Sequence, residues 1–340
     1  MTWWIIIGLL ALFAVYMYLQ NNWFQTTTYR LHLPKASHDL RNKRIVYLSD
    51  IDIKDRTKES FLARLVDQVR DAKPDLILLG GDTVQAQTGD TALEQLDHFL
   101  TKLTAVAPVI GILGGHELGN PRLNEIEAIF ADKNVRILHN EEELITVSDL
   151  GGGMASSDAR RDEAEENSDT DELSRRVVID AEDLAGEDIE SLTKKVNDSL
   201  PVQDNQENED GLRLWGLTEK EQTFIIKRKP LTRLQVEERD KDYPTILLAH
   251  YPQYFDNYLS DEDRIPDLIL CGHNHGGQFI LPFVGGLYAP RQGLNPKYDY
   301  GVFTHPKHPL VRMILGRGIG NSDFPWRFNN RPEIVLIVLE

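Results

Sequence analysis

Short runs of valine, isoleucine and leucine recur along the chain, and five of them end on a carboxylate or an imidazole. The five runs are RIVYLSDID (44–52), DLILLGGD (75–82), PVIGILGGHE (108–117), TILLAH (245–250) and DLILCGH (267–273). Apolar runs of this length without alternation are typical of strands that are covered on both faces. Between the first three runs, residues 61–73 and 92–105 repeat apolar positions at the three-to-four spacing of helices. This order of elements predicts a parallel sheet in the first half of the chain.

The polar residues at the ends of these runs are predicted to meet. Ligands of parallel sheets gather beyond the carboxyl ends of the strands. We therefore expect three aspartates and four histidines to converge there: Asp50, Asp52, Asp82, His116, His250, His273 and His275. Burying so many ionisable groups is costly unless something compensates their charges. Because divalent cations accept carboxylate oxygens and neutral imidazoles together, and a mixture of the two suits Mn, Fe or Zn, the set predicts a metal site.

Three further apolar segments follow the last of these runs. FILPFVGGLYAP (279–290), VRMILG (311–316) and EIVLIVL (333–339) alternate or run apolar between proline and glycine turns. We assign them to a second sheet. The predicted fold class is α/β, with a four-layer α/β/β/α sandwich in which two mixed sheets are flanked by helices.

The N-terminal segment WWIIIGLLALFAVYMYL (3–19) carries no charge and has the minimum length of a spanning helix, about 17–25 residues. Its flanks lack the basic region and the small-residue cleavage site of a secretory signal peptide. We predict a single-pass anchor at 1–24 in the cell membrane, followed by a juxtamembrane linker or strand at 25–43. A cleaved signal and a buried core helix are the alternatives. Basic residues follow the span and none precede it, so the positive-inside rule predicts a cytoplasmic body.

The acidity of the chain is concentrated in residues 149–210, which hold 20 acidic and 6 basic residues and contribute −14 of the net charge of −17. Such a composition cannot bury enough apolar surface to become ordered. Strand-like runs, EELITVS and GLRLWGL, flank the segment. We predict a disordered insert within a hairpin of a domain at 44–340. It is interpreted as a solvated spacer or, alternatively, as a docking loop for a basic protein partner. This acidity argues against binding of nucleic acid.

The order of the motifs resembles that of the calcineurin-like metallophosphoesterases, whose pattern runs D-x-H, G-D, G-N-H-E/D, H and G-H-x-H. The matching residues are Asp50-x-Asp52, Gly81-Asp82, Gly114-Gly115-His116-Glu117, His250 and Gly272-His273-x-His275. The resemblance covers the chain from about residue 44 to its end, apart from the acidic insert. The segments after His275 are similar to the membrane-anchored bacterial YkuE/YaeI-like phosphodiesterase branch.

The resemblance implies a pair of divalent ions and a hydrolase of phosphoric esters, with phosphodiesters favoured. It places a first metal at Asp50, Asp82, His275 and residue 52, and a second at Asp82, His250, His273 and residue 115, so that Asp82 bridges them. Manganese is the expected ion, with iron, zinc and magnesium as alternatives. The implied mechanism uses a metal-bridging hydroxide as the nucleophile, with His116 as the catalytic proton donor beside the leaving group. An anchor that holds this site near the bilayer suits a lipid-linked phosphoester substrate.

Two positions depart from the family pattern. Asp52 stands where the family has a histidine, and its added negative charge favours a harder ion such as Mn or Mg. Gly115 stands where the family has an asparagine, so we expect the second metal to bind more weakly. The alternative function is a weakened or inactive protein of this fold that binds a phosphorylated ligand or acts as a scaffold. We also expect Glu117 or another carboxylate to hold the tautomer of His116.

Overall fold

The computed structural model describes residues 2–150, 210–218, 229–234, 243–290, 292–321, 324 and 326–340. The chain divides into two units, one made of residues 1–153 and 210–340 and the other of residues 154–209. Every element named below belongs to the first unit. The predicted disordered insert lies almost entirely outside the described residues.

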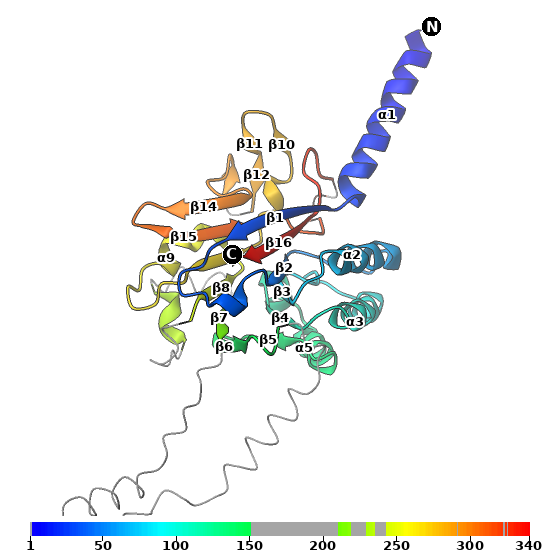
Figure 1. The fold of residues 1–340 in the computed structure, drawn as a ribbon. Coiled ribbons are helices and arrows are strands. Elements are labelled where there is room, and N and C mark those ends of the chain that lie inside the picture. Colours follow the sequence, from blue (N-terminus) through cyan, green and yellow to red (C-terminus); the bar gives the residue numbers. More distant parts are fainter. Residues whose placement is uncertain are drawn as a thin grey trace, which may run out of the picture. The chain divides into compact units, whose positions relative to one another are not determined.

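The first sheet has six strands and is mixed (Figure 1). Its order is β1 (Gln25–Leu31), β16 (Glu333–Leu339), β2 (Arg44–Leu48), β3 (Leu76–Gly80), β4 (Val109–Ile112) and β5 (Arg136–Ile137). Strands β2 to β5 are parallel, as predicted, and β16 runs antiparallel to β2. Strand β1 forms the edge and pairs in parallel with β16. Residues 25–31, which were expected to be a linker or strand, are therefore part of this sheet.

The second sheet is also mixed and has six strands. Its order is β14 (Gly301–His305), β15 (His308–Leu315), β9 (Leu268–Cys271), β8 (Thr245–Ala249), β7 (Gly211–Leu217) and β6 (Glu141–Thr146). Strands β15, β9, β8 and β7 are parallel. Strands β6 and β7 are antiparallel, with Thr146 opposite Gly211. The predicted strands on either side of the acidic segment therefore pair as a hairpin.

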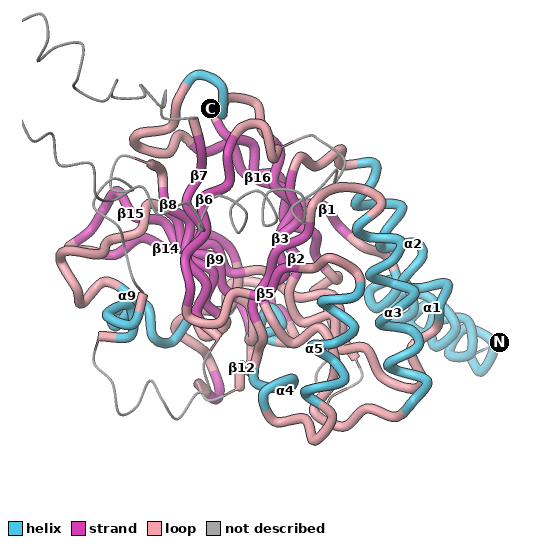
Figure 2. The backbone as a smooth tube through the Cα atoms, turned by 90° about the horizontal axis from the view of Figure 1, so that it is seen from below, coloured by secondary structure: helices cyan, strands magenta, loops and turns pink. Residues whose placement is uncertain are grey.

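Helices cover the outer faces of the two sheets (Figure 2). Helices α2 (Glu59–Asp71), α3 (Asp90–Thr104) and α5 (Leu123–Asp132) pack on the first sheet, and the short helix α9 (Phe255–Tyr258) packs on the second. Another apolar core fills the space between the sheets and contains Ile45, Leu78, Leu248 and Ile314. The predicted α/β class with two mixed sheets and outer helices is confirmed.

Two of the late apolar segments lie elsewhere than expected. EIVLIVL forms β16 in the first sheet, where all seven of its residues are buried between β1 and β2. Residues 279–290 contribute to two small ribbons, β10 (Ile280–Leu281) with β11 (Gly285–Gly286) and β12 (Tyr288–Ala289) with β13 (Gly293–Leu294). Only VRMILG joins the second sheet, in β15. A run that is apolar at every position fits a central strand of either sheet, so its pattern does not choose between them.

Helix α1 (Thr2–Asn22) precedes β1. Within the described part of the chain it is the one helix that could cross a membrane by length and composition, with a mean hydropathy of 1.8 over Trp3–Asn22. The span is not buried inside the protein, since side chains such as Trp4, Leu9 and Leu12 are largely exposed. This exposure differs from that of a core helix, and the span has the length and composition of either an anchor or a signal sequence.

Candidate metal centre

Strand ends from both sheets deliver the polar residues to one place. Asp50 and Asp52 follow β2, Asp82 follows β3, and His116 lies in α4 (Gly115–Leu118) directly after β4. From the second sheet, His250 follows β8, and His273 and His275 follow β9. An isolated bridge between Ile53 and Val84 and several backbone hydrogen bonds join the segments that follow β2 and β3, including Asp52 N to Asp82 O at 3.0 Å.

Asp82, His250 and His273 form the tightest group. One ligand atom from each of these side chains lies within 4.8 Å of the others. His250 Nε2 is 2.9 Å from Asp82 Oδ2, while His250 Nδ1 is 2.9 Å from the carbonyl oxygen of Gly80. A carbonyl at this distance accepts the Nδ1 proton and so leaves Nε2 as the nitrogen that faces Asp82, as in metal sites whose histidines are fixed by outer partners.

Asp50, Asp52 and His275 form a second group beside the first. His275 Nε2 is 3.6 Å from Asp52 Oδ2 and 3.9 Å from Asp50 Oδ1. His250 Nε2 is also 3.9 Å from Asp50 Oδ1, which joins the two groups. Ligand atoms bind a divalent metal ion at about 2.0–2.2 Å, so separations of this size suit atoms that share one cation.

The backbone at these residues is unusual. The φ angles of Asp50, Asp52, Asp82, His273 and His275 are 51°, 54°, 52°, 73° and 45°. Positive φ is uncommon for residues with a side chain, costs roughly 1–3 kcal/mol each, and clusters at functional sites. Of the six candidate ligands, only His250 does not have this conformation. Such strain persists only where the surrounding structure fixes it, so these side chains are held in a defined arrangement.

Charge in the cluster is balanced by protons on imidazoles. Burial raises the pKa of Asp50 to about 6, although nearby His250 lowers it. Burial also opposes the charge on His250, but Asp82 outweighs this effect and raises the pKa of His250 to about 10. The same contact holds the pKa of Asp82 below its usual range despite burial. Burial and the Arg327 guanidinium, which lies 3.4 Å from Nδ1, lower the pKa of His275 well below its usual value and keep it neutral.

These residues fit a pair of divalent cations. Asp52 Oδ2 is buried and has no hydrogen-bond partner among the described residues. An acceptor buried in this way is costly unless something else satisfies it. The donor set consists of carboxylate oxygens and imidazole nitrogens, the mixture that suits Mn, Fe or Zn. The orphaned oxygen faces His275, where the first ion is expected.

Asp52, rather than Glu117, is the carboxylate that is hydrogen-bonded to the His116 ring. His116 Nδ1 lies 2.9 Å from Asp52 Oδ1. Glu117 is fully buried and instead accepts hydrogen bonds from the backbone N–H groups of Asp82, Val84 and Gly114. Burial lowers the pKa of His116, but the hydrogen bond to Asp52 and the charge of Asp82 outweigh it and raise the pKa to about 9. A pKa of about 9 corresponds to a protonated His116 at neutral pH.

Tyr251 is a site residue that the sequence analysis missed. A Cβ added at Gly115 would lie 2.6 Å from Tyr251 Oη, so the phenol occupies the space next to the missing asparagine side chain. The Tyr251 ring packs edge-on against both His250 and His273, with centroids 4.9 and 4.8 Å apart. In the sequence, Tyr251 was indicated by its position directly after the candidate ligand His250. Gln85 is a second such residue, because its Nε2 donates to Asp52 Oδ1 at 2.9 Å.

Comparison with known proteins adds an independent observation. The sequence pattern described as calcineurin-like phosphoesterase matches residues 43–277. The chain is 24% identical to UDP-2,3-diacylglucosamine pyrophosphatase LpxG of Chlamydia trachomatis, over 94% of this chain and 90% of that protein. It is 23% identical to the uncharacterized metallophosphoesterase YkuE of Bacillus subtilis, over 95% and 88%. It is 34% identical to the phosphodiesterase YaeI of Escherichia coli, over 29% and 34%.

Proposed function

We propose that this chain, which belongs to the calcineurin-like phosphoesterase family, is a membrane-tethered metallophosphoesterase that cleaves phosphodiesters at the site around Asp82. The observation that carries the proposal is the convergence of carboxylates and imidazoles from the ends of five strands, with left-handed backbone at most of them. The similarity to LpxG and YaeI, a pyrophosphatase and a phosphodiesterase, supports diester or pyrophosphate cleavage.

Six side chains are proposed to hold two divalent cations, with manganese as the expected pair. Asp50, Asp52 and His275 serve the first ion, and His250 and His273 serve the second. Asp82 contacts His250 of the second group and the His116 ring, which in turn contacts Asp52 of the first, and it is proposed to be shared. Bound there, the ions supply an activated water and neutralise negative charge on the phosphoryl oxygens.

His116 is proposed to donate a proton to the oxygen of the leaving group. Its side chain is 31% exposed, so it is open on one side. Asp52 contacts Nδ1 and thereby leaves Nε2 as the nitrogen that can face a substrate. The backbone N–H of His116 donates to Asp82 Oδ1 at 2.7 Å and fixes the residue against the cluster. A proton donor held in this way contributes about 10²–10⁴-fold in rate.

Hydrolysis of 4-nitrophenyl phosphodiesters by the full chain in detergent tests this function. Turnover is expected when Mn²⁺ is added to protein that has been stripped of metal, and none before the addition. Absence of turnover at every concentration of Mn²⁺, Fe²⁺ and Zn²⁺, with binding of a phosphorylated ligand retained, would leave the inactive binding protein as the function.

Gly115→Asn alone is expected to bring no gain in affinity for the second ion, because its Cβ would lie 2.6 Å from Tyr251 Oη. The next Tyr251 atom, Cζ, is 3.7 Å away, so Gly115→Asn with Tyr251→Phe gives the new side chain room. We expect the double variant to bind the second Mn²⁺ at least about tenfold more tightly in calorimetric titration, with Tyr251→Phe alone as the control. An equal gain from Gly115→Asn alone would contradict this account of Tyr251.

Helix α1 is proposed to be a single-pass anchor in the cell membrane, with the catalytic body on the cytoplasmic side. The uncharged span and the basic residues that follow it, the nearest of which are Arg30 and Lys35, support this orientation. Protease added to intact cells is expected to spare a C-terminal tag and to cut it only after the membrane is permeabilised. Cutting in intact cells would place the body on the outside.

A further inference from the structure

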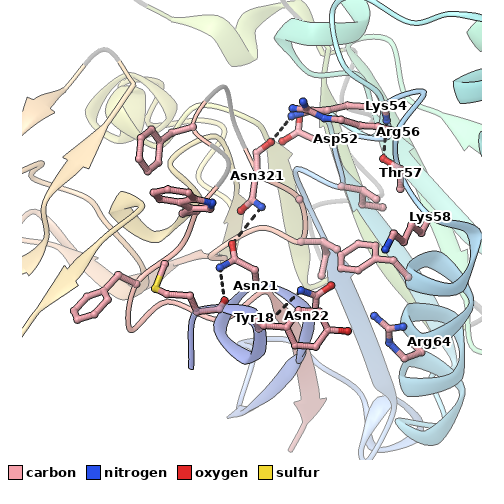
Figure 3. Close-up of a pocket in the computed structure, with 18 of the residues that line it drawn as sticks. Tyr18, Asn21, Asn22, Asp52, Lys54, Arg56, Thr57, Lys58, Arg64 and Asn321 are labelled. Carbon is pink, nitrogen blue, oxygen red and sulfur yellow. Dashed lines mark hydrogen bonds between the residues drawn. The ribbon is translucent and has the colours of Figure 1, made fainter. Parts of the chain in front are cut away.

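A cavity of about 1070 Å³ lies between α1, the segment that leads from Ile51 into α2, and the residues before β16 (Figure 3). Its volume is at the upper end of the range for small-molecule sites. One of its lining residues is Asp52, which also contacts His116 and faces His275. Because the Asp52 side chain is itself buried, the cavity ends beside the candidate metal centre, on the side on which the anchor helix lies.

One part of the cavity lining is apolar and includes the anchor itself. Phe13, Ala14 and Met17 of α1 contribute to it, together with Phe61 of α2 and Phe328. The α1 residues belong to a span whose apolar side chains are not buried in the protein. The lining is thus continuous with the helix surface that a bilayer would surround. An alkyl chain could pass from lipid into this space without crossing a polar layer.

Hydrogen bonds attach α1 to the body at this cavity. Arg327 N donates to Asn21 Oδ1 at 3.0 Å, and Asn21 Nδ2 donates to Arg327 O at 3.4 Å. The Tyr16 hydroxyl donates to Asn329 one turn earlier in the helix. Arg327 is fully buried and also donates to the carbonyl of Arg317, so its hydrogen bonds with Asn21 connect α1 to the buried interior. The part of α1 that lines the cavity is therefore bound to the rest of the protein.

The other part of the lining is basic. Lys54, Arg56, Lys58 and Arg64 contribute to it, whereas Asp52 is the one acidic residue in the lining that the structure describes. Lys58 and Arg64 lie on the α2 side of the cavity, across from Asn21 and Asn22 of α1 (Figure 3). Both are exposed. A site with an apolar wall, several cations and a metal-binding carboxylate at one end is complementary to an amphiphile with an anionic head.

We infer that this cavity binds the alkyl chain and phosphate head of a membrane lipid phosphoester and presents that phosphate to the metal centre. The inference rests on the proposed function and names its substrate class. The chain of the lipid lies against α1 near Ala14, and Lys58 and Arg64 attract the phosphate as it approaches Asp52. The anchor helix is then a wall of the substrate site as well as a tether.

The test compares two substrates that share the same chemistry, 4-nitrophenyl methyl phosphate and 4-nitrophenyl hexadecyl phosphate. Both are given to the full-length, Mn²⁺-loaded protein in micelles of a neutral detergent, and the ratio of their kcat/KM values is measured. The hexadecyl substrate and the protein enter the same micelles, which raises the ratio of the kcat/KM values even if the cavity binds nothing. The ratios of the variants are therefore compared with that of the wild-type protein in the same detergent.

Ala14→Trp fills the cavity from the anchor, and Val15→Trp places the same ring on the neighbouring residue, which is exposed and outside the lining. We expect Ala14→Trp to lower the long-chain to short-chain ratio at least about tenfold and Val15→Trp to preserve it. Lys58→Gln with Arg64→Gln is expected to raise the KM of the hexadecyl substrate several-fold. Arg70→Gln, on the same helix but outside the lining, is the control for the charge.

The inference is overturned if Ala14→Trp keeps the wild-type ratio, if Val15→Trp lowers it equally, or if Lys58→Gln with Arg64→Gln changes KM no more than Arg70→Gln. Each of these results leaves the proposed function intact, provided that the methyl substrate is still hydrolysed. Failure of the wild-type protein to hydrolyse either substrate at any Mn²⁺ concentration contradicts the proposed function and, with it, this inference.

Discussion

Asp82→Asn is expected to lower kcat/KM by at least about 10³-fold and to reduce the amount of bound metal. Asp82 Oδ2 is 2.9 Å from His250 Nε2 in one group of candidate ligands. It is also 3.5 Å from His116 Nδ1, which contacts Asp52 of the other group, so the side chain lies near both groups. Asparagine keeps the size and one acceptor but removes the charge that would be shared by two cations. Their stabilisation of phosphoryl charge is worth several kcal/mol, and each 1.36 kcal/mol corresponds to a factor of ten.

The measurement for Asp82→Asn is turnover of a 4-nitrophenyl phosphodiester together with metal content by elemental analysis. Asp71→Asn is the matched control, because Asp71 is an exposed carboxylate at the end of α2. Wild-type metal content with wild-type turnover in Asp82→Asn would show that this carboxylate holds no catalytic ion. Loss of turnover with full metal content would make Asp82 important for another reason than metal binding.

His116→Ala is expected to lower kcat by about 10²–10⁴-fold while the metal content stays unchanged. Alanine retains the backbone N–H that donates to Asp82 Oδ1, so the proposed ligands should keep their positions. The loss should be greater for a substrate with an alkoxide leaving group than for one that releases 4-nitrophenolate, because a poor leaving group depends more on a proton. Kinetics with the two leaving groups, measured beside metal analysis, provide the check.

His139→Ala serves as the control for the His116 substitution, since His139 lies on the surface with a side chain 45% exposed. An equal loss for both leaving groups in His116→Ala would argue that His116 binds the phosphate rather than protonating the departing oxygen. No loss at all would remove His116 from the mechanism.

The strands that carry the site were predictable because they are short, continuous apolar runs that end in polar residues. β2, β3, β4, β8 and β9 all lie within the predicted runs. The placement of β16 was not predictable, since all seven of its residues are buried and such a run fits the centre of either sheet. β1 is rich in threonine and alternates between half-buried and exposed residues, so it had the pattern of a strand without an indication of its partner.

The contacts between the site residues were harder to predict than the identity of these residues. The motifs identify the seven candidate residues, but the contact of Asp52 with His116 joins positions 64 apart in the chain. The approach of Tyr251 to Gly115 and the contact of Asn21 with Arg327 likewise depend on how distant segments fold together. The left-handed backbone of Asp50, Asp82 and His273 was also hidden, because the residue type that indicates this conformation is glycine.

Anomalous X-ray scattering from crystals of the Mn²⁺-loaded protein tests the central claim most directly, because it locates the ions rather than counting them. The account predicts two anomalous peaks. One should lie within bonding distance of Asp50, Asp52 and His275, the other within bonding distance of His250 and His273, and both should contact Asp82. Well-diffracting crystals with no peak beside these six residues, or with manganese bound only elsewhere, would contradict it.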